Sequence, residues 1–177
     1  MSLVRAVVLN GTCGAGKTTI GETMAEVLAD DGDAVAFIDV DALGAAWPRP
    51  ADDPYNVRLA AKNLGSVAEN FAGAGVRSLV VASVVQNEAD LARYSSAVGQ
   101  LLEVVRLVAP LDVIDERLRL RHGPADPDGM AWHRSRAPEL DRLLDDASLP
   151  MTVVENAGTK ERVARAVLDA IGWIATG

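Results

Sequence analysis

Hydrophobic and polar residues follow two different periods along this chain. Short apolar runs predict strands at residues 4–10, 34–41, 77–85, 102–109 and 151–158. Between these runs, apolar residues recur at helical spacing, as with Ile20, Met24 and Leu28. Helices are therefore expected at residues 17–32, 54–75 (with Gly65 as a candidate break), 88–99, 110–121, 131–146 (at least after Pro138) and 159–174.

The alternation of strand and helix continues to the end of the sequence. This order is typical of a parallel sheet with helices on both faces. Right-handed crossovers between the five expected strands predict an α/β, doubly wound sandwich. Ligands bind such sheets beyond the carboxyl ends of the strands. The loops of interest therefore begin at Gly11, Asp39, Ser83, Pro110 and Asn156.

The length of the chain limits the number of domains, and its net charge limits the classes of binding partner. With 177 residues we expect a single domain spanning 1–177, as a monomer or a homodimer. The net charge is −8 and the acidic residues are scattered, so we expect no basic face that would bind nucleic acid. A local cluster of arginines could still attract a small anion. No apolar run reaches 18 residues, so no membrane partner is expected.

Cysteine usage and the N-terminus bear on the compartment. Cys13 is the only cysteine, so an intrachain disulfide is impossible, as is usual in a reducing cytosol. The first apolar run is too short for a secretory signal, and no small-residue cleavage site follows it. We therefore expect a cytoplasmic protein. No histidine lies near Cys13 in the sequence to activate it, which argues against a nucleophile.

The sequence GTCGAGKT (residues 11–18) lies between the first predicted strand and the first predicted helix. It matches the P-loop pattern G-x-x-x-x-G-K-[ST] in full. Its glycines let amide N–H groups point inward around phosphate oxygens, and the following helix adds its dipole. Lys17 is expected to reach the β- and γ-phosphates, and Thr18 to ligate Mg²⁺. The expected nucleotide-binding residues here are Gly11, Thr12, Cys13, Gly14, Ala15, Gly16, Lys17, Thr18 and Thr19.

Other features separate the classes of P-loop protein. A GTPase would carry the guanine motif N-K-x-D, which is absent from the sequence. A D-x-x-G spacing occurs at Asp126–Gly129, but after the fourth strand, where a GTPase switch is not expected. Motor ATPases and transporters need further modules, for which a chain of this length has no room. ATP is therefore the expected nucleotide.

The second predicted strand ends in FIDVD, which brings Asp39 and Asp41 to its carboxyl end. On an extended segment, residues two apart share one face, so these carboxylates are expected side by side near the P-loop. One can hold Mg²⁺, directly or through water. The other can orient an attacking hydroxyl or accept its proton. Aspartate is also common at strand exits, but the P-loop favours a functional pair.

A cluster of arginines lies in the predicted helix after the fourth strand. Arg117 and Arg121 are four residues apart and share a face, whereas Arg119 points elsewhere. A loop rich in glycine, proline and aspartate follows at residues 123–130. We expect residues 121–137 to form a short lid that closes over the triphosphate, excludes water and stabilises transition-state charge.

Two histidines and two tryptophans carry further expectations. His122 and His133 flank the loop of the lid and are expected to be solvent-exposed. Trp132 is expected to pack against the lid, and Trp173 to fix the last helix to the core.

Residues 42–64 are expected to form the acceptor side, and we call them the acceptor segment. Arg49 and Arg58 are candidates to bind an anionic group, and Trp47 or Tyr55 to contact a ring face. Gln86, after the third strand, is a candidate to bind substrate hydroxyls.

These residues resemble the small P-loop phosphotransferases, which include adenylylsulfate kinase, shikimate kinase, gluconate kinase and the chloramphenicol phosphotransferases. NGTCGAGKTT is similar to their nucleotide loop, FIDVD to the Asp-x-Asp after their second strand, and LDVIDERLRLR to their lid entrance. The resemblance covers most of the chain and implies a P-loop NTPase fold with strand order 2-3-1-4-5. It also implies that Asp39 holds Mg²⁺, that Asp41 meets the acceptor hydroxyl, and that Asn156, in ENAG, lies near adenine.

The acceptor side departs from this family. Adenylylsulfate kinases carry Asp-Asn-x-Arg directly after the second strand, whereas here ALGAAWPRP follows Asp41. The paired glycines of shikimate kinase after the third strand are replaced by ASVVQN. The resemblance therefore implies a reaction type and leaves the acceptor open.

We predict an adenylylsulfate kinase-like phosphotransferase that moves the γ-phosphoryl group of ATP to a hydroxyl of a small molecule with Mg²⁺. The predicted catalytic residues are Lys17, Asp39, Asp41, Arg117 and Arg121, with Arg117 and Asn156 also binding the nucleotide. The predicted acceptor-binding residues are Asp41, Arg49, Arg58 and Gln86, and the metal ligands are Thr18 and Asp39. Alternatives are an antibiotic or a nucleoside monophosphate as acceptor, or a regulator that binds ATP without transfer.

Overall fold

The computed structural model describes residues 3–123 and 125–174. One parallel sheet of order β2-β3-β1-β4-β5 contains the strands β1 (Arg5–Asn10), β2 (Val35–Asp39), β3 (Ser78–Ala82), β4 (Glu103–Val108) and β5 (Thr152–Glu155). The helices are α1 (Lys17–Asp30), α2 (Val40–Leu43), α3 (Val57–Gly73), α4 (Glu88–Val98), α5 (Leu111–His122), α6 (Pro127–Asp145) and α7 (Lys160–Ala170). The predicted doubly wound fold and its strand order are confirmed.

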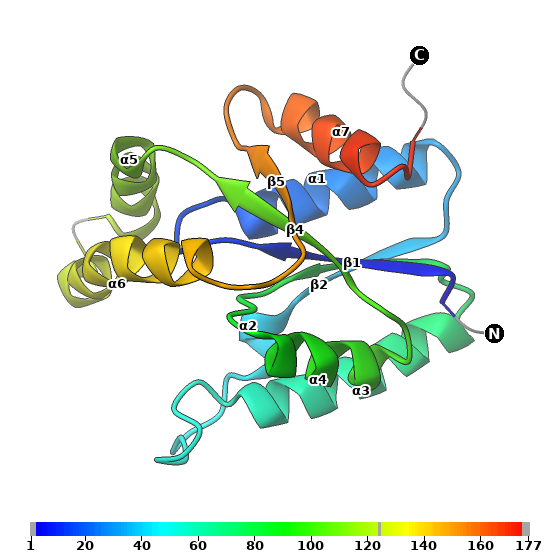
Figure 1. The fold of residues 1–177 in the computed structure, drawn as a ribbon, viewed down its shortest axis with the longest axis horizontal. Coiled ribbons are helices and arrows are strands. Elements are labelled where there is room, and N and C mark those ends of the chain that lie inside the picture. Colours follow the sequence, from blue (N-terminus) through cyan, green and yellow to red (C-terminus); the bar gives the residue numbers. More distant parts are fainter. Residues whose placement is uncertain (1–2, 124, 175–177) are drawn as a thin grey trace.

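Helices cover both faces of the sheet, α1 and α7 on one side and α3 and α4 on the other (Figure 1). Side chains of β1 alternate between the two faces. Val7 and Leu9 join the core cluster beneath α1 and α7, whereas Ala6 and Val8 join the cluster beneath α3 and α4. None of the described helices combines the length and apolar character needed to span a bilayer.

The structure corrects the expected extended segment around the two aspartates. Strand β2 ends at Asp39, and Asp41 lies in the first turn of α2. The cause is local, because Asp39 Oδ1 accepts a hydrogen bond from the backbone N–H of Asp41 at 3.0 Å and thereby caps the short helix. A strand through residue 41 is therefore wrong, and two different elements present the carboxylates.

Helix α3 also runs unbroken through Gly65, contrary to the candidate break. A Cβ atom at this position would lie 2.9 Å from the carbonyl oxygen of Ala97 in α4. Gly65 is therefore explained by the close approach of two helices, which leaves no room for a side chain.

Helix α6 begins at Pro127, earlier than expected, and replaces the second half of the predicted loop at 123–130. Asp126 caps it by accepting a hydrogen bond from the backbone N–H of Gly129 at 3.0 Å, and Pro127 occupies the first turn, where a missing N–H is tolerated. The D-x-x-G spacing is thus a helix cap. The helix continues through Pro138 to Asp145.

The amino ends of β1 and β3 meet at a polar cluster of Arg5, Asp33, Ser78 and Trp173, which we call the amino-edge cluster. Arg5 forms an ion pair with Asp33 and donates to Ser78 Oγ at 2.9 Å and to the carbonyl of Trp173 at 3.2 Å. Its guanidinium lies 4.4 Å from the centre of the Trp173 ring. Trp173 is only 8% exposed and packs into the core beside α1 and α7, as predicted.

Candidate functional site

The P-loop connects β1 to α1 at the carboxyl edge of the sheet (Figure 1). Gly11 and Gly16 have φ angles of +143° and +94°, which residues with side chains rarely adopt. A Cβ atom at Gly11 would lie 2.6 Å from the carbonyl oxygen of Leu107. No side chain caps α1, so the first amide N–H groups of that helix have no side-chain acceptor. The loop therefore has the strained backbone and open donors that suit an anion.

Two side chains fix the base of the loop, and no local pattern in the sequence predicts their contacts. Asn10 Oδ1 accepts hydrogen bonds from the N–H groups of Gly11 at 2.9 Å and Val85 at 3.1 Å. Thr12 is buried, and its hydroxyl donates to the carbonyl of Ala137 in α6 at 2.6 Å. The Thr12 side chain thus binds the lid helix, which leaves only its backbone for the predicted nucleotide contact.

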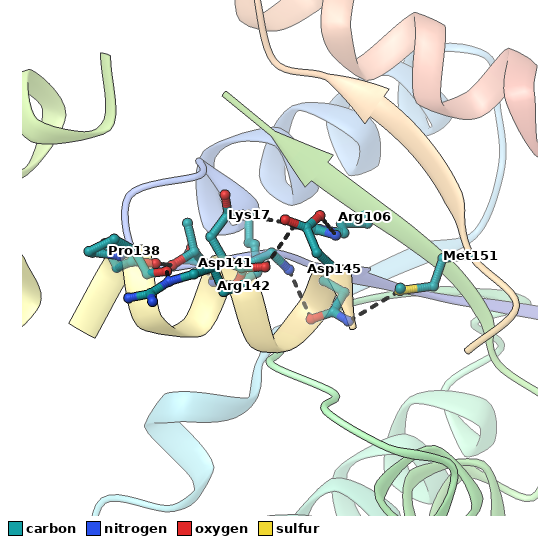
Figure 2. A network of polar contacts seen from close by, with 11 residues as sticks. Lys17, Arg106, Pro138, Asp141, Arg142, Asp145 and Met151 are labelled. Atoms are coloured by element: carbon teal, nitrogen blue, oxygen red, sulfur yellow. Dashed lines mark hydrogen bonds and ion pairs between the residues drawn. The ribbon is translucent and has the colours of Figure 1, made fainter. Parts of the chain in front are cut away.

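A further network holds α6 against the sheet (Figure 2). Arg106 of β4 is buried and forms ion pairs with Asp141 at 2.9 Å and Asp145 at 2.7 Å. These contacts secure the second half of α6, beyond Pro138. An arginine in a predicted interior strand is a signal that could have indicated a buried ion pair, but its partners are distant in sequence.

Lys17 is folded back onto the P-loop. Its Nζ donates to the carbonyl oxygens of Gly11 at 2.8 Å and Thr12 at 3.0 Å. Burial lowers the pKa of Lys17, although the nearby Cys13, Asp41 and Asp39 favour its charged form. A buried ammonium whose hydrogen-bond partners are neutral is well placed to gain from an incoming anion.

Thr18 and Asp39 are in direct contact. The hydroxyl of Thr18 donates to Asp39 Oδ2 at 2.7 Å, which joins the first turn of α1 to the end of β2. Hydroxyl and carboxylate oxygens are ligands that Mg²⁺ accepts, together with phosphate oxygens and water. Among the described residues no group of three or more His, Cys, Asp or Glu side chains could hold a metal alone. A magnesium ion held by Thr18 and Asp39 would take its other ligands from phosphate oxygens and water.

A cavity of about 760 Å³ opens above these residues. The P-loop, the ends of β2 and β3, helix α5 and the loop after β5 all contribute to its wall. It is lined by Cys13, Gly14, Gly16, Lys17, Thr18, Thr19, Ile20, Asp39, Asp41, Ala42, Ala82, Val84, Arg117, Leu118, Arg121, His133, Asn156, Gly158 and Lys160. The predicted catalytic and metal-binding residues therefore lie around one space.

Two arginines of α5 contribute cationic groups to this cavity. Arg117 donates from Nη2 to the carbonyl of Asn156 at 3.1 Å, while its Nη1 is buried without a hydrogen-bond partner. Arg121 lines the cavity and forms no hydrogen bond or ion pair with another described residue. Asn156 donates to the carbonyl of Ala15 at 2.7 Å and so connects the loop after β5 to the P-loop. Arg119 pairs with Asp115 and is 63% exposed, away from the cavity, as predicted.

Cys13 lines the same cavity but is a poor nucleophile. Burial raises the pKa of its thiol, and this effect outweighs the influence of nearby Lys17. The thiol form therefore prevails at neutral pH, which agrees with a packing role.

The expectation that both lid histidines are exposed is wrong. The side chain of His122 is only 8% exposed and pairs with Asp126 at 2.6 Å. His133 is partly buried, lines the cavity and hydrogen-bonds through Nδ1 to the carbonyl of Gly129 at 2.8 Å. Trp132 packs edge-on against His133, as expected for a residue of the lid, although it remains half exposed. Because the loop is helical, the two histidine rings are brought together.

The predicted acceptor residues Arg49, Arg58 and Gln86 lie outside the lining of the cavity. Arg49 lies over the ring of Trp47 at 5.7 Å. Arg58 pairs with Asp52 at 2.9 Å. Contact of these three residues with a bound molecule remains a prediction, whereas Asp41 is exposed and lines the cavity.

Solved structures share this architecture. A gluconokinase from Sinorhizobium meliloti 1021 is similar with a TM-score of 0.65 at 20% identity, over 98% of this chain and 94% of that one. An APS kinase from Mycobacterium tuberculosis, in complex with AMPPNP and APS, gives 0.62 at 19% identity, over 97% and 99%. A shikimate kinase from Acinetobacter baumannii, in complex with shikimate, gives 0.59 at 24% identity, over 96% and 94%. At these identities the likeness establishes the fold, which is the one the sequence resemblance implied.

Sequence comparison adds a family. No curated protein matches the sequence. The model for the CobQ/CobB/MinD/ParA nucleotide-binding domain matches residues 6–176, nearly the whole chain, and so includes the P-loop and every residue of the cavity. The chain therefore belongs to the CobQ/CobB/MinD/ParA nucleotide-binding domain family.

Proposed function

We propose that this protein uses ATP and Mg²⁺ to transfer the γ-phosphoryl group to a hydroxyl of a small molecule. One observation carries the proposal: the contact between Thr18 and Asp39 at 2.7 Å lies in the same cavity as Lys17 and a second carboxylate, Asp41. A site that only binds nucleotide has no need of that second carboxylate. The kinase fold of the structural neighbours supports the same reaction type.

The triphosphate would lie along the P-loop and the start of α1. Open amide groups and the helix dipole favour its negative charge, and Lys17 would exchange its carbonyl partners for phosphate oxygens. Thr18 and Asp39 are the residues that would hold Mg²⁺, which neutralises phosphate charge and orients the γ-phosphoryl group when bound. Arg117 and Asn156 line the nucleotide side of the cavity.

Asp41 would meet the acceptor. Its carboxylate is exposed at the cavity, where it can accept a hydrogen bond from an attacking hydroxyl and orient that oxygen in line with the phosphoryl group. Arg121 has no partner among the described residues and would stabilise the charge that spreads over the transferring oxygens. The apolar residues Ala82 and Val84 close the wall beyond β3.

The identity of the acceptor is a separate matter. The names of the neighbours point to different acceptors, so the shared fold does not select one. An acceptor phosphate, as in a nucleoside monophosphate, calls for several free arginines. Arg49 donates to the carbonyl of Pro54 at 3.2 Å, and Arg58 is neutralised by Asp52 and Asp53. The contacts of these arginines favour a small hydroxyl compound, including an antibiotic, over a monophosphate.

The test is ATP consumption by the purified protein with Mg²⁺, alone and with a set of sugars, sugar acids, cyclic alcohols, nucleosides and hydroxylated antibiotics. We expect at least one compound to stimulate consumption and to yield a phosphorylated product by mass spectrometry. Asp41→Asn should abolish this stimulation and preserve ATP binding, whereas Asp30→Asn, an exposed position at the far end of α1, should retain it. ATP binding without stimulation by any compound would instead support the rival function, an ATP-binding regulator.

A further inference from the structure

The only two histidines of the chain meet in the lid, and one of them faces the nucleotide cavity. Nδ1 of His133 lies 2.8 Å from the carbonyl oxygen of Gly129. Because a carbonyl oxygen can only accept, Nδ1 carries the hydrogen. The second nitrogen, Nε2, forms no hydrogen bond with a described residue and is not among the buried polar atoms that lack a partner. Nε2 is therefore accessible, on a ring that lines the cavity.

The ring of His133 is held in place from two sides. Its centre lies 4.7 Å from the ring of His122, tilted by 39°, and 4.7 Å from the ring of Trp132 in an edge-on arrangement. His122 is fixed in turn by its contact with Asp126 at 2.6 Å. Nε2 thus has a defined direction before any ligand binds, which reduces the entropy cost of making a contact.

Burial and nearby positive charge hold the pKa of His133 below its ordinary value, which favours the neutral ring. Burial lowers its pKa most, and His122 and Arg121 of α5 lower it further. The hydrogen bond to Gly129 and the carboxylate of Asp126 act in the opposite direction on this pKa but do not outweigh the lowering effects. A neutral ring with hydrogen on Nδ1 presents a bare lone pair at Nε2.

We propose that His133 is a proton-linked phosphate ligand of the lid: when a nucleotide triphosphate enters, Nε2 takes up one proton from solvent and donates a hydrogen bond to a phosphate oxygen. The inference rests on the proposed ATP binding. An anion beside Nε2 reverses the local balance of charge, because it stabilises the imidazolium that Arg121 otherwise disfavours. The only covalent bond formed is the N–H bond at Nε2, and its proton returns to solvent when the nucleotide leaves.

Because proton uptake is coupled to nucleotide binding, it determines how the affinity for Mg·ATP depends on pH. His133 has a lower pKa in the free protein than in the complex, so binding takes up protons at pH values between the two. The affinity for Mg·ATP should therefore rise as pH falls through that window, whose lower limit lies below the ordinary histidine value of about 6.5. The titration of ATP itself contributes to this slope equally in any variant, so it cancels in a comparison.

Two variants separate the hydrogen bond from the titration. The glutamine side chain of His133→Gln would place an amide N–H near the position of Nε2 but cannot titrate, whereas the side chain of His133→Asn reaches only about as far as Nδ1. By calorimetry at pH 6 and pH 8, wild-type protein should gain affinity at the lower pH by more than either variant does. At pH 6, His133→Asn should bind Mg·ATP about tenfold more weakly, the size of one charge-assisted hydrogen bond, with His133→Gln in between.

Nuclear magnetic resonance gives a readout that does not depend on activity. The protein yields just two histidine ring signals, which His122→Asn and His133→Asn assign. In the free protein at pH 8, long-range ¹⁵N–¹H spectra should show His133 with hydrogen on Nδ1 only. The non-hydrolysable analogue AMPPNP with Mg²⁺ should raise its pKa and protonate Nε2.

The outcomes distinguish this inference from the function on which it rests. If AMPPNP binds and leaves the His133 pKa unchanged, or if the free ring carries its hydrogen on Nε2, the role of His133 is overturned and ATP binding stands. If well-folded protein binds neither ATP nor AMPPNP, the proposed function fails and His133 loses its ligand with it.

Discussion

Arginine side chains at the amino and carboxyl edges of the sheet differ in whether their N–H groups have hydrogen-bond partners. At the amino edge, Arg5 contacts Asp33, Ser78 and Trp173, with a partner for each of its three nitrogens. At the carboxyl edge, Arg117 leaves Nη1 buried without a partner, and Arg121 pairs with no described residue. Both edges lie in one fold and carry similar groups, but only one of them leaves its donors unsatisfied.

Unsatisfied buried donors lower stability, because desolvation is not compensated by a hydrogen bond. At the amino edge this cost is avoided, because each nitrogen of Arg5 has a partner. At the carboxyl edge we expect the unsatisfied groups to gain partners when the proposed nucleotide binds. Lack of a partner does not by itself mark a ligand site, because Nε of Arg106, which holds α6 against the sheet, is also buried without one.

The largest expected effect comes from Lys17→Ala. The ammonium donates only to the carbonyls of Gly11 and Thr12, so its loss should leave the thermal midpoint unchanged or slightly higher. Turnover of ATP with a stimulating acceptor should fall by about 10³-fold, since charge at the transferring phosphoryl group is no longer neutralised. Arg93→Ala, at an exposed position of α4 outside the lining of the cavity, is the control. Retained turnover in Lys17→Ala would exclude this side chain from the mechanism.

A smaller effect is expected from Arg117→Met. The change removes a buried N–H that has no acceptor but also the hydrogen bond to the carbonyl of Asn156, so the two effects oppose each other and the free energy of unfolding should change by less than about 1 kcal/mol. The Kd for Mg·ATP measured by calorimetry should rise roughly 10-fold to 100-fold with the lost charge-assisted contacts. A variant that unfolds more easily and binds ATP normally would show that Arg117 is structural, which would remove the contrast between the two edges.

Arg5→Met is the reciprocal change at the amino edge. It removes the ion pair of Asp33, which keeps its hydrogen bond from Ser78, and it leaves the carbonyl of Trp173 without its donor. We expect the free energy of unfolding in urea to fall by about 1–2 kcal/mol, reduced by partial exposure of the pair. ATP affinity should not change, because the cluster lies at the opposite edge of the sheet from the P-loop. Weakened ATP binding in a stable Arg5→Met protein would contradict the separation.

The smallest effect is expected for Asp33→Asn, in the dependence of the free energy of unfolding on pH. Burial alone would raise the pKa of Asp33, but hydrogen bonds from Arg5 and Ser78 outweigh it and hold the pKa below its ordinary value. The unfolded carboxyl titrates near 3.9, so the contribution of Asp33 is present above about pH 4 and is lost as pH falls through the lower folded pKa. In Asp33→Asn, the free energy of unfolding should fall less steeply below about pH 4 than in the wild type. Identical slopes would show that the pair does not perturb this carboxyl.

Short-range sequence patterns predicted the parts of the structure that depend on residues close together in the sequence. The strands and the P-loop follow from short-range periodicity and from one motif, whereas the strand order was implied by the family resemblance. Asp41 escaped the pattern because a side-chain cap at Asp39 ended the strand two residues early. The start of α6 was missed for the same reason, since Asp126 acts as a cap in a segment whose composition is typical of a loop.

Long-range partners were beyond the reach of the sequence. Arg58 belongs to a residue type that binds anions. Asp52 and Asp53 form ion pairs with it only in the folded acceptor segment, and the sequence does not show these pairs. His122 and His133 are eleven residues apart, and their contact depends on how α5 and α6 turn. Whether a polar group is free to bind a ligand depends on tertiary packing, which cannot be read from a single sequence.

The attachment of α6 has a mechanical consequence. Thr12 binds Ala137, and Arg106 binds Asp141 and Asp145, so the stretch beyond Pro138 is clamped to the nucleotide loop and the sheet. The stretch before that clamp carries His133 and packs on α5 through the ion pair of Arg134 with Asp115 and the contact of the two histidine rings. The position of His133 at the cavity therefore depends on α5 as well as on the nucleotide loop and the sheet.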